Sequence, residues 1–393
     1  MKTKFNLYIL EYAIDSMIRN RFKNISILII FISLVFLISS VLFISNSIQY
    51  ELDNTVDNLP EITIQKIKAG RIEEIDIGIV DKISQIRGVE DVIPRVWGYY
   101  YFKSAGVNFT IMGLDGFATQ YTNSLERVSQ KFDINSLENS MIIGEGVEKI
   151  LKKGYYSSYF NFITSKGELK KINIAGVFKS QTQLESNDMI ILSQDNAREI
   201  FNMSDNKASD IIVKVANPKE ITTIVSKIRT LYPDSRIITK EDLKVSYQNI
   251  FNYKKGFFLA IFTISLFTFF MIIYDKISGV SSFETQEIAI LKAIGWRVDD
   301  ILKEKFYEAF IISSISFIIG ISISLWFVYT LQAPLLKEIF IGYSDLRPIF
   351  NLPFNIDYSS LALVFLLTIP IYISASIIPS WRVATSDSDD IMR

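Results

Sequence analysis

The sequence lacks cysteine and histidine throughout its 393 residues. Their absence excludes disulfide bonds, thiolate or imidazole metal ligands, and any mechanism with a histidine base or a cysteine nucleophile. Carboxylates are present, but no paired-carboxylate or Ser-Lys arrangement is recognisable, so we expect neither an enzyme nor a metal site. The 41 Lys and Arg balance the 42 Asp and Glu, and the net charge of -1 argues against a nucleic-acid-binding protein.

Long apolar runs are abundant, since 49% of the residues are apolar. A bilayer core about 30 Å thick needs roughly 20 apolar residues in a helix, because a helix satisfies its own backbone polar groups in lipid. Four windows meet this requirement without a charged residue, which argues against an intramembrane ion relay. We therefore predict four transmembrane helices, placed around these windows at residues 25–46, 253–276, 306–331 and 358–380.

The first span follows a basic N-terminal segment, residues 1–24. Its residues Phe5, Ile9, Tyr12 and Ser16 recur at three- and four-residue spacing, which predicts an amphipathic helix in the membrane interface. An ordinary basic flank of an anchor is the alternative. A cleaved signal peptide is a further alternative for the span itself, but no small-x-small cleavage pattern follows it, so we expect an anchor that is retained.

Lysine and arginine near the spans indicate their orientation, because short cytoplasmic segments carry an excess of both residues. Five basic residues precede the first span, and five lie between the second and third: Lys2, Lys4, Arg19, Arg21 and Lys23, then Lys276, Lys292, Arg297, Lys303 and Lys305. The loop at 332–357 has only Lys337 and Arg347. We therefore expect a multi-pass protein of the cytoplasmic (inner) membrane, with both termini, including the tail at 381–393, in the cytoplasm. Lys254 and Lys255 oppose this orientation, but they adjoin a long domain, where the rule loses force.

Residues 47–252 form one long insertion between the first and second spans. Strand-like alternation and helical spacing follow each other along it, for example at 61–67, 76–87 and 218–233. This pattern predicts a large extracytoplasmic α+β domain. From Glu241 onward the chain looks helical and is expected to run directly into the second span.

An aromatic cluster stands out in this insertion, at "PRVWGYYYF" (94–102). Trp97, Tyr99 and Tyr101 alternate along a predicted strand and could form a surface for a partner or a substrate. Strand alternation favours the account in which one face belongs to the domain core and the other faces a partner.

A charged helical segment lies between the second and third spans, in the loop at 277–305. Ile288, Leu291 and Ile294 share one stripe, and Gly295 is placed to end the helix. Such a glycine-broken helix has a shape suited to docking in a groove of a partner. A solvated loop is the alternative on composition alone.

The stretch "ETQEIAILKAIGWRVDDIL" resembles the coupling loop of the FtsX-like, MacB-type ABC transporter permeases. The matching positions are Glu284, Glu287, Ile288, Leu291, Lys292, Ala293, Gly295, Asp300 and Ile301. Two positions depart from the pattern: Ala289 replaces the common glycine, and Trp296 replaces a small residue. The tail resembles the family's terminus at Pro379, Arg382, Ala384 and Arg393, with Ser388 where the family prefers proline. "SMIIGEGVEKIL" and "INIAGVFKS" resemble its outer domain, so the resemblance spans nearly the whole chain.

The resemblance implies a permease subunit that converts ATP hydrolysis in a partner into movement of its outer domain, a process called mechanotransmission. The chain has no G-x-x-x-x-G-K-[ST] phosphate loop, so ATP and Mg²⁺ would bind to a separate ATPase subunit with a Walker A motif, and this chain would bind no cofactor. The same resemblance assigns the ATPase-coupling role to Glu284, Glu287, Ile288, Leu291, Lys292, Ala293 and Gly295. It also implies pairing with a second permease copy or paralogue and contact with membrane lipid, and it is compatible with a periplasmic partner.

Several functions remain open at the level of the sequence. Within the family, a macrolide or peptide exporter, a lipoprotein-releasing machine and a cell-wall hydrolase regulator differ mainly in the outer domain and the partners. Outside it, a membrane sensor or adaptor could transmit a signal from the outer domain to a cytoplasmic protein. A neighbouring gene for an ATPase would favour the transporter, and one for a kinase or regulator would favour the sensor.

Overall fold

The computed structural model describes residues 7–57, 59–114, 139–178, 187–278, 282–334, 336–341 and 351–385. The chain divides into two compact units. The helical unit comprises Met1–Ile48, Tyr253–Phe340 and Leu352–Arg393, and the α+β unit comprises Gln49–Asn252 and Ile341–Asn351. Phe5 and the tail residues Ser388 and Arg393 lie outside the described residues.

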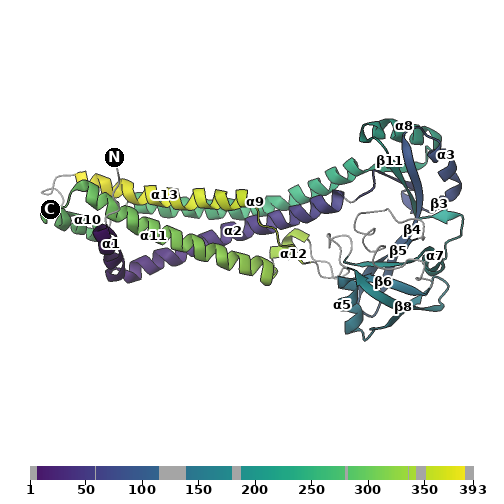
Figure 1. Cartoon of the computed structure of the whole chain (residues 1–393), viewed down its shortest axis with the longest axis horizontal. Helices are drawn as coiled ribbons and strands as arrows, with labels where there is room; N and C mark the ends of the chain where they lie inside the picture. Colours follow the sequence, from purple (N-terminus) through teal and green to yellow (C-terminus); the bar gives the residue numbers. More distant parts are fainter. Residues whose placement is uncertain are drawn as a thin grey trace. The chain divides into compact units, whose positions relative to one another are not determined.

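The helical unit contains the predicted N-terminal helix and the long apolar helices (Figure 1). Its elements are α1 (Leu7–Arg19), α2 (Arg21–Asp57), α9 (Lys240–Ser278), α10 (Ser282–Ala293), α11 (Val298–Leu325), a π-helical turn (Trp326–Thr330), α12 (Leu336–Ile341) and α13 (Tyr358–Thr385). The end of α2 and the start of α9 belong to the α+β unit. The expected continuous helix from Glu241 into the second span is confirmed by α9, and α2 likewise continues beyond its predicted span.

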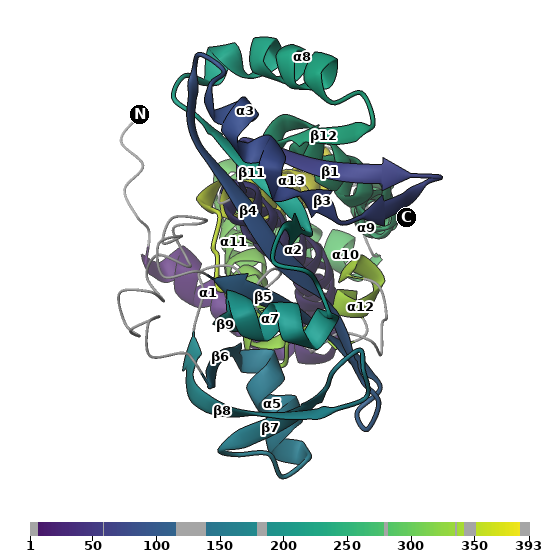
Figure 2. The ribbon, with the colours of Figure 1, turned by 90° about the vertical axis from the view of Figure 1, so that its right-hand side faces the viewer.

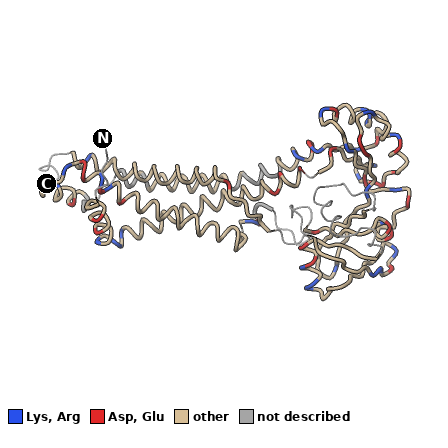
Figure 3. Tube along the Cα trace, in the orientation of Figure 1, with Lys and Arg blue, Asp and Glu red and all other residues tan. Residues whose placement is uncertain are grey.

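Three of these helices are long and apolar enough to cross a membrane, within the residues that the structure describes. They span Arg21–Asp57, Val298–Thr330 and Tyr358–Thr385, and α9 adds a shorter apolar stretch, Leu259–Ile272. Charged residues are scarce along these helices and gather around α1, α10 and the start of α11 (Figure 3). The chain is thus a membrane protein with three candidate spans, and the fourth span, in α9, stays a prediction.

One apolar cluster joins the four long helices of this unit. It consists of Phe31 and Leu34 from α2, Phe269 from α9, Ala309 and Ile312 from α11, and Tyr372 and Ala375 from α13. The Phe31 ring lies 5.5 Å from that of Phe269 and 4.7 Å from that of Tyr372, measured between centroids. Small and hydroxyl residues allow close approach elsewhere, as where Ser40 Oγ of α2 lies 3.0 Å from Ser324 Oγ of α11.

The α+β unit is built on one ten-stranded sheet, as counted over its described residues. The strand order is β12-β1-β11-β4-β5-β9-β6-β8-β7, with β2 paired to β1. The bounds are β1 Ile62–Lys68, β2 Arg71–Glu73, β4 Val89–Phe102, β5 Val107–Leu114, β6 Ser140–Gly144, β7 Tyr159–Ile163, β8 Leu169–Phe178, β9 Met189–Ser193, β11 Asp210–Val215 and β12 Ser235–Thr239. A separate pair is formed by β3 (Ile75–Asp76) and β10 (Lys207–Ala208). The predicted α+β class is therefore confirmed.

Strand β4 connects two halves of the sheet, each with its own helices (Figure 2). Its first part pairs with β11 and its second part with β5. Helices α3 (Val80–Ser84) and α8 (Ile221–Leu231) pack on the first half, where Ile83, Ile224 and Ile228 are buried with residues of β1 and β11. Helices α5 (Glu145–Lys153) and α7 (Gln194–Phe201) pack on the second half around Phe109, Phe160 and Phe162.

The helix predicted at 76–87 is shorter than its apolar spacing suggests. A 3₁₀ turn at Ile77–Ile79 leads into α3, which ends at Ser84. The Asp76 carboxylate accepts a hydrogen bond from the Gly78 amide at 2.8 Å. The segment 76–87 therefore begins with a tight Asx-type turn and not with a regular helix. Gly88 has φ +98° and lies in the turn between α3 and β4.

Candidate functional site

Helix α10 and the turn after it are the first candidate site. Gly295 has φ +101°, and the Gly295 and Trp296 amides donate to the carbonyls of Lys292 and Leu291, both at 3.0 Å. This arrangement closes the C-terminus of α10 with a left-handed glycine, as the sequence predicted. The chain then enters α11 at Val298.

The inner face of α10 is buried within this chain. Ile288 is 0% exposed and Leu291 is 4% exposed, in a cluster with Ile301 of α11 and Ala384 of α13. These two residues therefore offer no apolar surface to another protein. The predicted stripe of Ile288, Leu291 and Ile294 is therefore divided in the structure: Ile288 and Leu291 face the protein's own interior and cannot fill a groove in a partner, whereas Ile294 is exposed.

The outer face of α10 carries a different pair of isoleucines. Ile290 is 58% exposed and Ile294 is 72% exposed, and their four-residue spacing puts both on one side. Ala293 and Gly295 are exposed beside them, and Lys292 is partly buried. We call Ile290 and Ala293 of α10, together with Ile294 and Gly295 of the turn that follows it, the outer α10 face. Ile290 was not among the residues predicted from the sequence, although its four-residue spacing from Ile294 was a usable signal.

Glu287 is buried on the inner face and lies between two cations. Its Oε1 accepts hydrogen bonds from Arg19 Nη2 at 2.5 Å and from Ser16 Oγ at 3.2 Å. Its Oε2 lies 3.7 Å from Lys305 Nζ, which also contacts the carboxylates of Glu304 and Glu308. The predicted coupling residue Glu287 is thus an intramolecular contact in this chain. The Glu284 side chain lies outside the described part of the structure.

Arg19 remains charged in this environment. Hydrogen bonding to Tyr12, opposed by partial burial and supported by the charge of Glu287, raises the pKa of its guanidinium above the ordinary value. Arg19 therefore carries its positive charge next to the Glu287 carboxylate.

The aromatic residues of β4 form the second candidate site. Tyr99 and Tyr101 are exposed, whereas Trp97 is half-buried and meets the Tyr99 ring edge-on at 5.7 Å. On the opposite side of the strand, Val96 and Phe102 belong to the core. The predicted division of this strand into a core face and an exposed aromatic face is confirmed, and the partner remains a prediction.

Trp97 is held in place by a buried ion pair. Arg95 Nε and Nη2 donate to the two carboxylate oxygens of Asp210, both at 2.7 Å, and Trp97 Nε1 donates to Asp210 Oδ2 at 2.8 Å. Asp210 is fully buried, and these donors offset the free-energy cost of burying its carboxylate. The pair fixes β4 to β11 at the base of the aromatic face.

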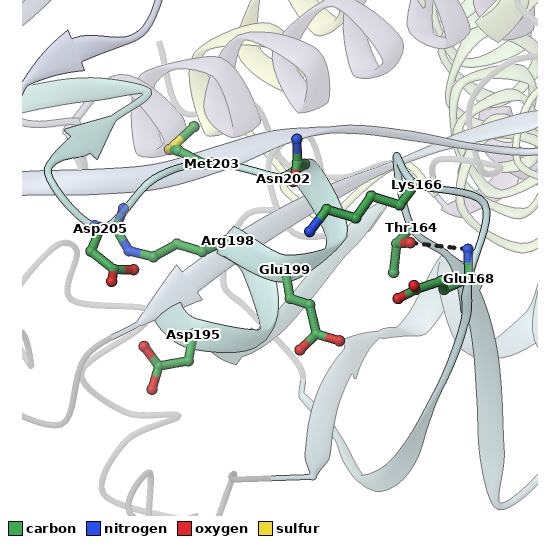
Figure 4. Close-up of a pocket in the computed structure, with 9 residues that line it drawn as sticks. All are labelled: Thr164, Lys166, Glu168, Asp195, Arg198, Glu199, Asn202, Met203 and Asp205. Atoms are coloured by element: carbon green, nitrogen blue, oxygen red, sulfur yellow. Dashed lines mark hydrogen bonds between the residues drawn. The ribbon is translucent and has the colours of Figure 1, made fainter.

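A polar hollow of about 350 Å³ lies between the β7–β8 turn and α7 (Figure 4). Its charged lining residues are of both signs: Lys166, Glu168, Asp195, Arg198, Glu199 and Asp205. Arg198 Nη1 donates to the carbonyls of Ser204 and Lys207, both at 2.6 Å, and Lys170 pairs with Glu199. The Arg198 contacts hold the loop after α7, and Arg198 and Glu199 thus have partners within the chain.

The comparisons with known proteins give two family matches that divide the chain. Residues 25–231, more than half of the chain, match the MacB-like periplasmic core domain, and residues 256–387 match the FtsX-like permease C-terminal domain. No curated protein sequence matches this chain.

Two solved structures are similar in part. The periplasmic region of MacB from Actinobacillus actinomycetemcomitans is 13% identical with a TM-score of 0.33, and it covers 48% of this chain and 93% of its own. The extracellular domain of the noncanonic ABC-type transporter YknZ from Gram-positive bacteria is 14% identical with a TM-score of 0.29, covering 45% of this chain and 99% of its own. At these TM-scores the classification depends on the family matches. Because those matches account for both the inserted α+β unit and the helical unit after it, this chain belongs to the FtsX-like, MacB-type family of ABC transporter permeases.

Proposed function

We propose that this chain is the membrane subunit of an ABC transporter that couples ATP hydrolysis by a separate ATPase subunit to movement of its α+β unit. The movement would drive export or extraction of a substrate at the outer face of the membrane. Membership of the permease family supports this function and implies an ATPase partner. The absence of a phosphate loop from the sequence supports placing ATP and Mg²⁺ in that partner.

The outer α10 face carries the proposal. Two isoleucines more than half exposed on a short helix are unfavourable in water, and full burial of one such side chain is worth about 1.5–3 kcal/mol. An ATPase groove that covers Ile290 and Ile294 would gain this free energy. Glu287, Ile288 and Leu291 would act indirectly, by fixing α10 to the rest of the helical unit.

Two long helices provide the mechanical connection in this proposal. Helices α2 and α9 each continue without a break from an apolar segment into the α+β unit. Within that unit, Lys240 Nζ donates to the carbonyl of Asp57 at 2.7 Å, so the start of α9 is tied to the end of α2. An α-helix is stiff along its axis, and a displacement at one end would reach the sheet. Pairing with a second copy or a paralogue would allow the two outer units to move against each other.

Affinity purification from native membranes tests the function. We expect the wild-type chain to retain a stoichiometric ATPase subunit with vanadate-sensitive hydrolysis. Replacing Ile290 and Ile294 together by Glu should abolish retention, whereas Ile290→Leu should preserve it. Thr385→Glu, which adds a charge at another exposed helical position of the same unit, is the control and should retain the ATPase.

Two results would contradict parts of the proposal. If the wild-type chain repeatedly retained no ATPase and instead retained a kinase or regulator, the function would be that of a sensor. If the double variant kept full ATPase retention and hydrolysis, the outer α10 face would not be the docking surface.

A further inference from the structure

The N-terminal helix α1 contacts the coupling helix α10 directly. Ser16 and Arg19 lie in the last turns of α1, and both donate to Glu287 Oε1. The two residues are separated from Glu287 by more than 260 positions in the sequence. Arg19 is partly exposed and Glu287 is 9% exposed, so the pair lies at the edge of a buried interface.

A second contact joins α1 to the turn after α10. The Tyr12 and Trp296 rings have centroids 5.0 Å apart with planes inclined at 53°. Tyr12 and Trp296 also pack against the cluster that contains Ile288 and Leu291. Trp296 is one of the two positions that depart from the family's coupling pattern, which has a small residue there.

Helix α10 depends on such contacts for its orientation. It has twelve residues, and an isolated helix of this length is marginal in water, so packing must fix it. Helices α11 and α13 cover its inner apolar residues. Helix α1 adds contacts at two points, one on α10 itself and one just beyond Gly295, and so opposes both rotation and tilting of the helix.

We propose that α1 is a working part of the ATPase-coupling joint, in which Arg19 and Tyr12 act as positioning residues that orient α10. In this arrangement the N-terminal helix has a role beyond contact with lipid. Changes at Arg19 alter which way Ile290 and Ile294 face, although Arg19 itself does not touch the ATPase. The coupling part of this inference depends on the proposed function, whereas the positioning part does not.

Distance measurements test the positioning part without any ATPase. The chain has no native cysteine, so Asp15→Cys on α1 and Gln286→Cys on α10, both at exposed positions, give two defined spin-label sites. In the full chain in lipid nanodiscs we expect one narrow distance distribution. Arg19→Glu should broaden the distance distribution, because two carboxylates then face each other. Arg19→Lys keeps the positive charge and should give a distribution as narrow as that of the wild type. Arg21→Glu is the matched control, because Arg21 lies over the Phe22 ring, away from Glu287.

ATPase retention by the same variants tests the coupling part. We expect Arg19→Glu to lower retention by about fivefold, the upper range for loss of a partly exposed ion pair, with Arg19→Lys and Arg21→Glu near wild type. A broadened distance with unchanged retention would overturn the coupling role, and an unchanged distance would overturn the positioning role. If the wild-type chain retained no ATPase, the proposed function would fail, and the distances alone would decide the role of α1.

Discussion

Gly320 of α11 lies directly against Val35 of α2. A Cβ atom at position 320 would come within 2.7 Å of both Cβ and Cγ1 of Val35, and within 3.1 Å of the Ile32 carbonyl oxygen. Val35 itself is fully buried. Close approach through a glycine is a common way to pack helices in membranes, where dispersion and not the hydrophobic effect drives association.

Gly320→Ala should therefore separate α2 from α11. We expect the free energy of unfolding to fall by about 1–3 kcal/mol, the usual cost of overpacking. Thermal unfolding in detergent measures this change. Gly256→Ala is the matched control, because no atom lies within 4 Å of an added Cβ there and the change improves helix propensity. Equal stability of the two variants would contradict the close contact.

Trp296→Ala should loosen α1 without unfolding the helical unit. Loss of the ring contact with Tyr12 is worth about 1 kcal/mol. Hydrogen exchange of the α1 amides should accelerate, and the exchange of α13 should stay unchanged. Trp381→Ala removes an exposed tryptophan from α13 and serves as the control. Unchanged exchange in α1 would mean that the indole does not hold this helix.

The sequence predicted more of the fold than of the site. Strand alternation predicted strands of the α+β unit such as those at 61–67 and 94–102, because one face of each strand must be buried. It did not predict the short strands β2, β3 and β10 or the strand β12. Periodicity also identified α10 and its end at Gly295. It could not show which face of α10 the chain itself covers, since that depends on Ile301 and Ala384, which are remote in the sequence. For this reason the sequence predicted that Ile288 and Leu291 contact an ATPase partner, and it did not identify Ile290 as exposed.

The contacts that Glu287 makes within its own chain could not be predicted from the sequence, for a related reason. A glutamate on an amphipathic helix has the same pattern whether its partner is another protein or another helix of the same chain. Only the structure shows that Arg19, near the N-terminus, and Lys305, in the helix after α10, both reach it.

Asp210→Ala should destabilise the α+β unit strongly. It would leave the Arg95 guanidinium, which is only 17% exposed, without its carboxylate, and breaking a buried pair costs about 3 kcal/mol. Trp97 is a local reporter, because it is the single tryptophan between residues 49 and 252. Denaturant unfolding can be followed by its fluorescence after the other three tryptophans are replaced by Phe.

The control for this prediction lies on the same pair of strands. Glu90 of β4 contacts Lys214 of β11 at 3.3 Å, and both side chains are exposed. Glu90→Ala should cost no more than about 1 kcal/mol. If Asp210→Ala and Glu90→Ala lowered the free energy of unfolding by similar amounts, burial would not make the Arg95–Asp210 pair more stabilising than the exposed Glu90–Lys214 pair.

The start of α9 should become less stable in acid. Thr239 Oγ1 and Asp242 form a capping box: the Asp242 carboxylate accepts from the Thr239 amide at 2.9 Å, and the Asp242 amide donates to Thr239 Oγ1 at 3.1 Å. The hydrogen bond from the Thr239 amide is the main cause that lowers the pKa of Asp242 below its ordinary value. The cap is therefore fully stabilising above the ordinary aspartate pKa and is lost as the pH falls through the lower pKa of the folded state.

Asp242→Asn tests this by hydrogen exchange over the first turn of α9. At neutral pH the variant should exchange faster than the wild type, because the charged acceptor is gone. The difference should shrink in acid, below the ordinary aspartate pKa, as the wild-type carboxylate is protonated. Glu241→Gln changes a neighbouring exposed carboxylate and should leave the capping contacts intact. A difference between Asp242→Asn and wild type that persists unchanged through this acid range would show that the carboxylate charge does not stabilise the start of α9.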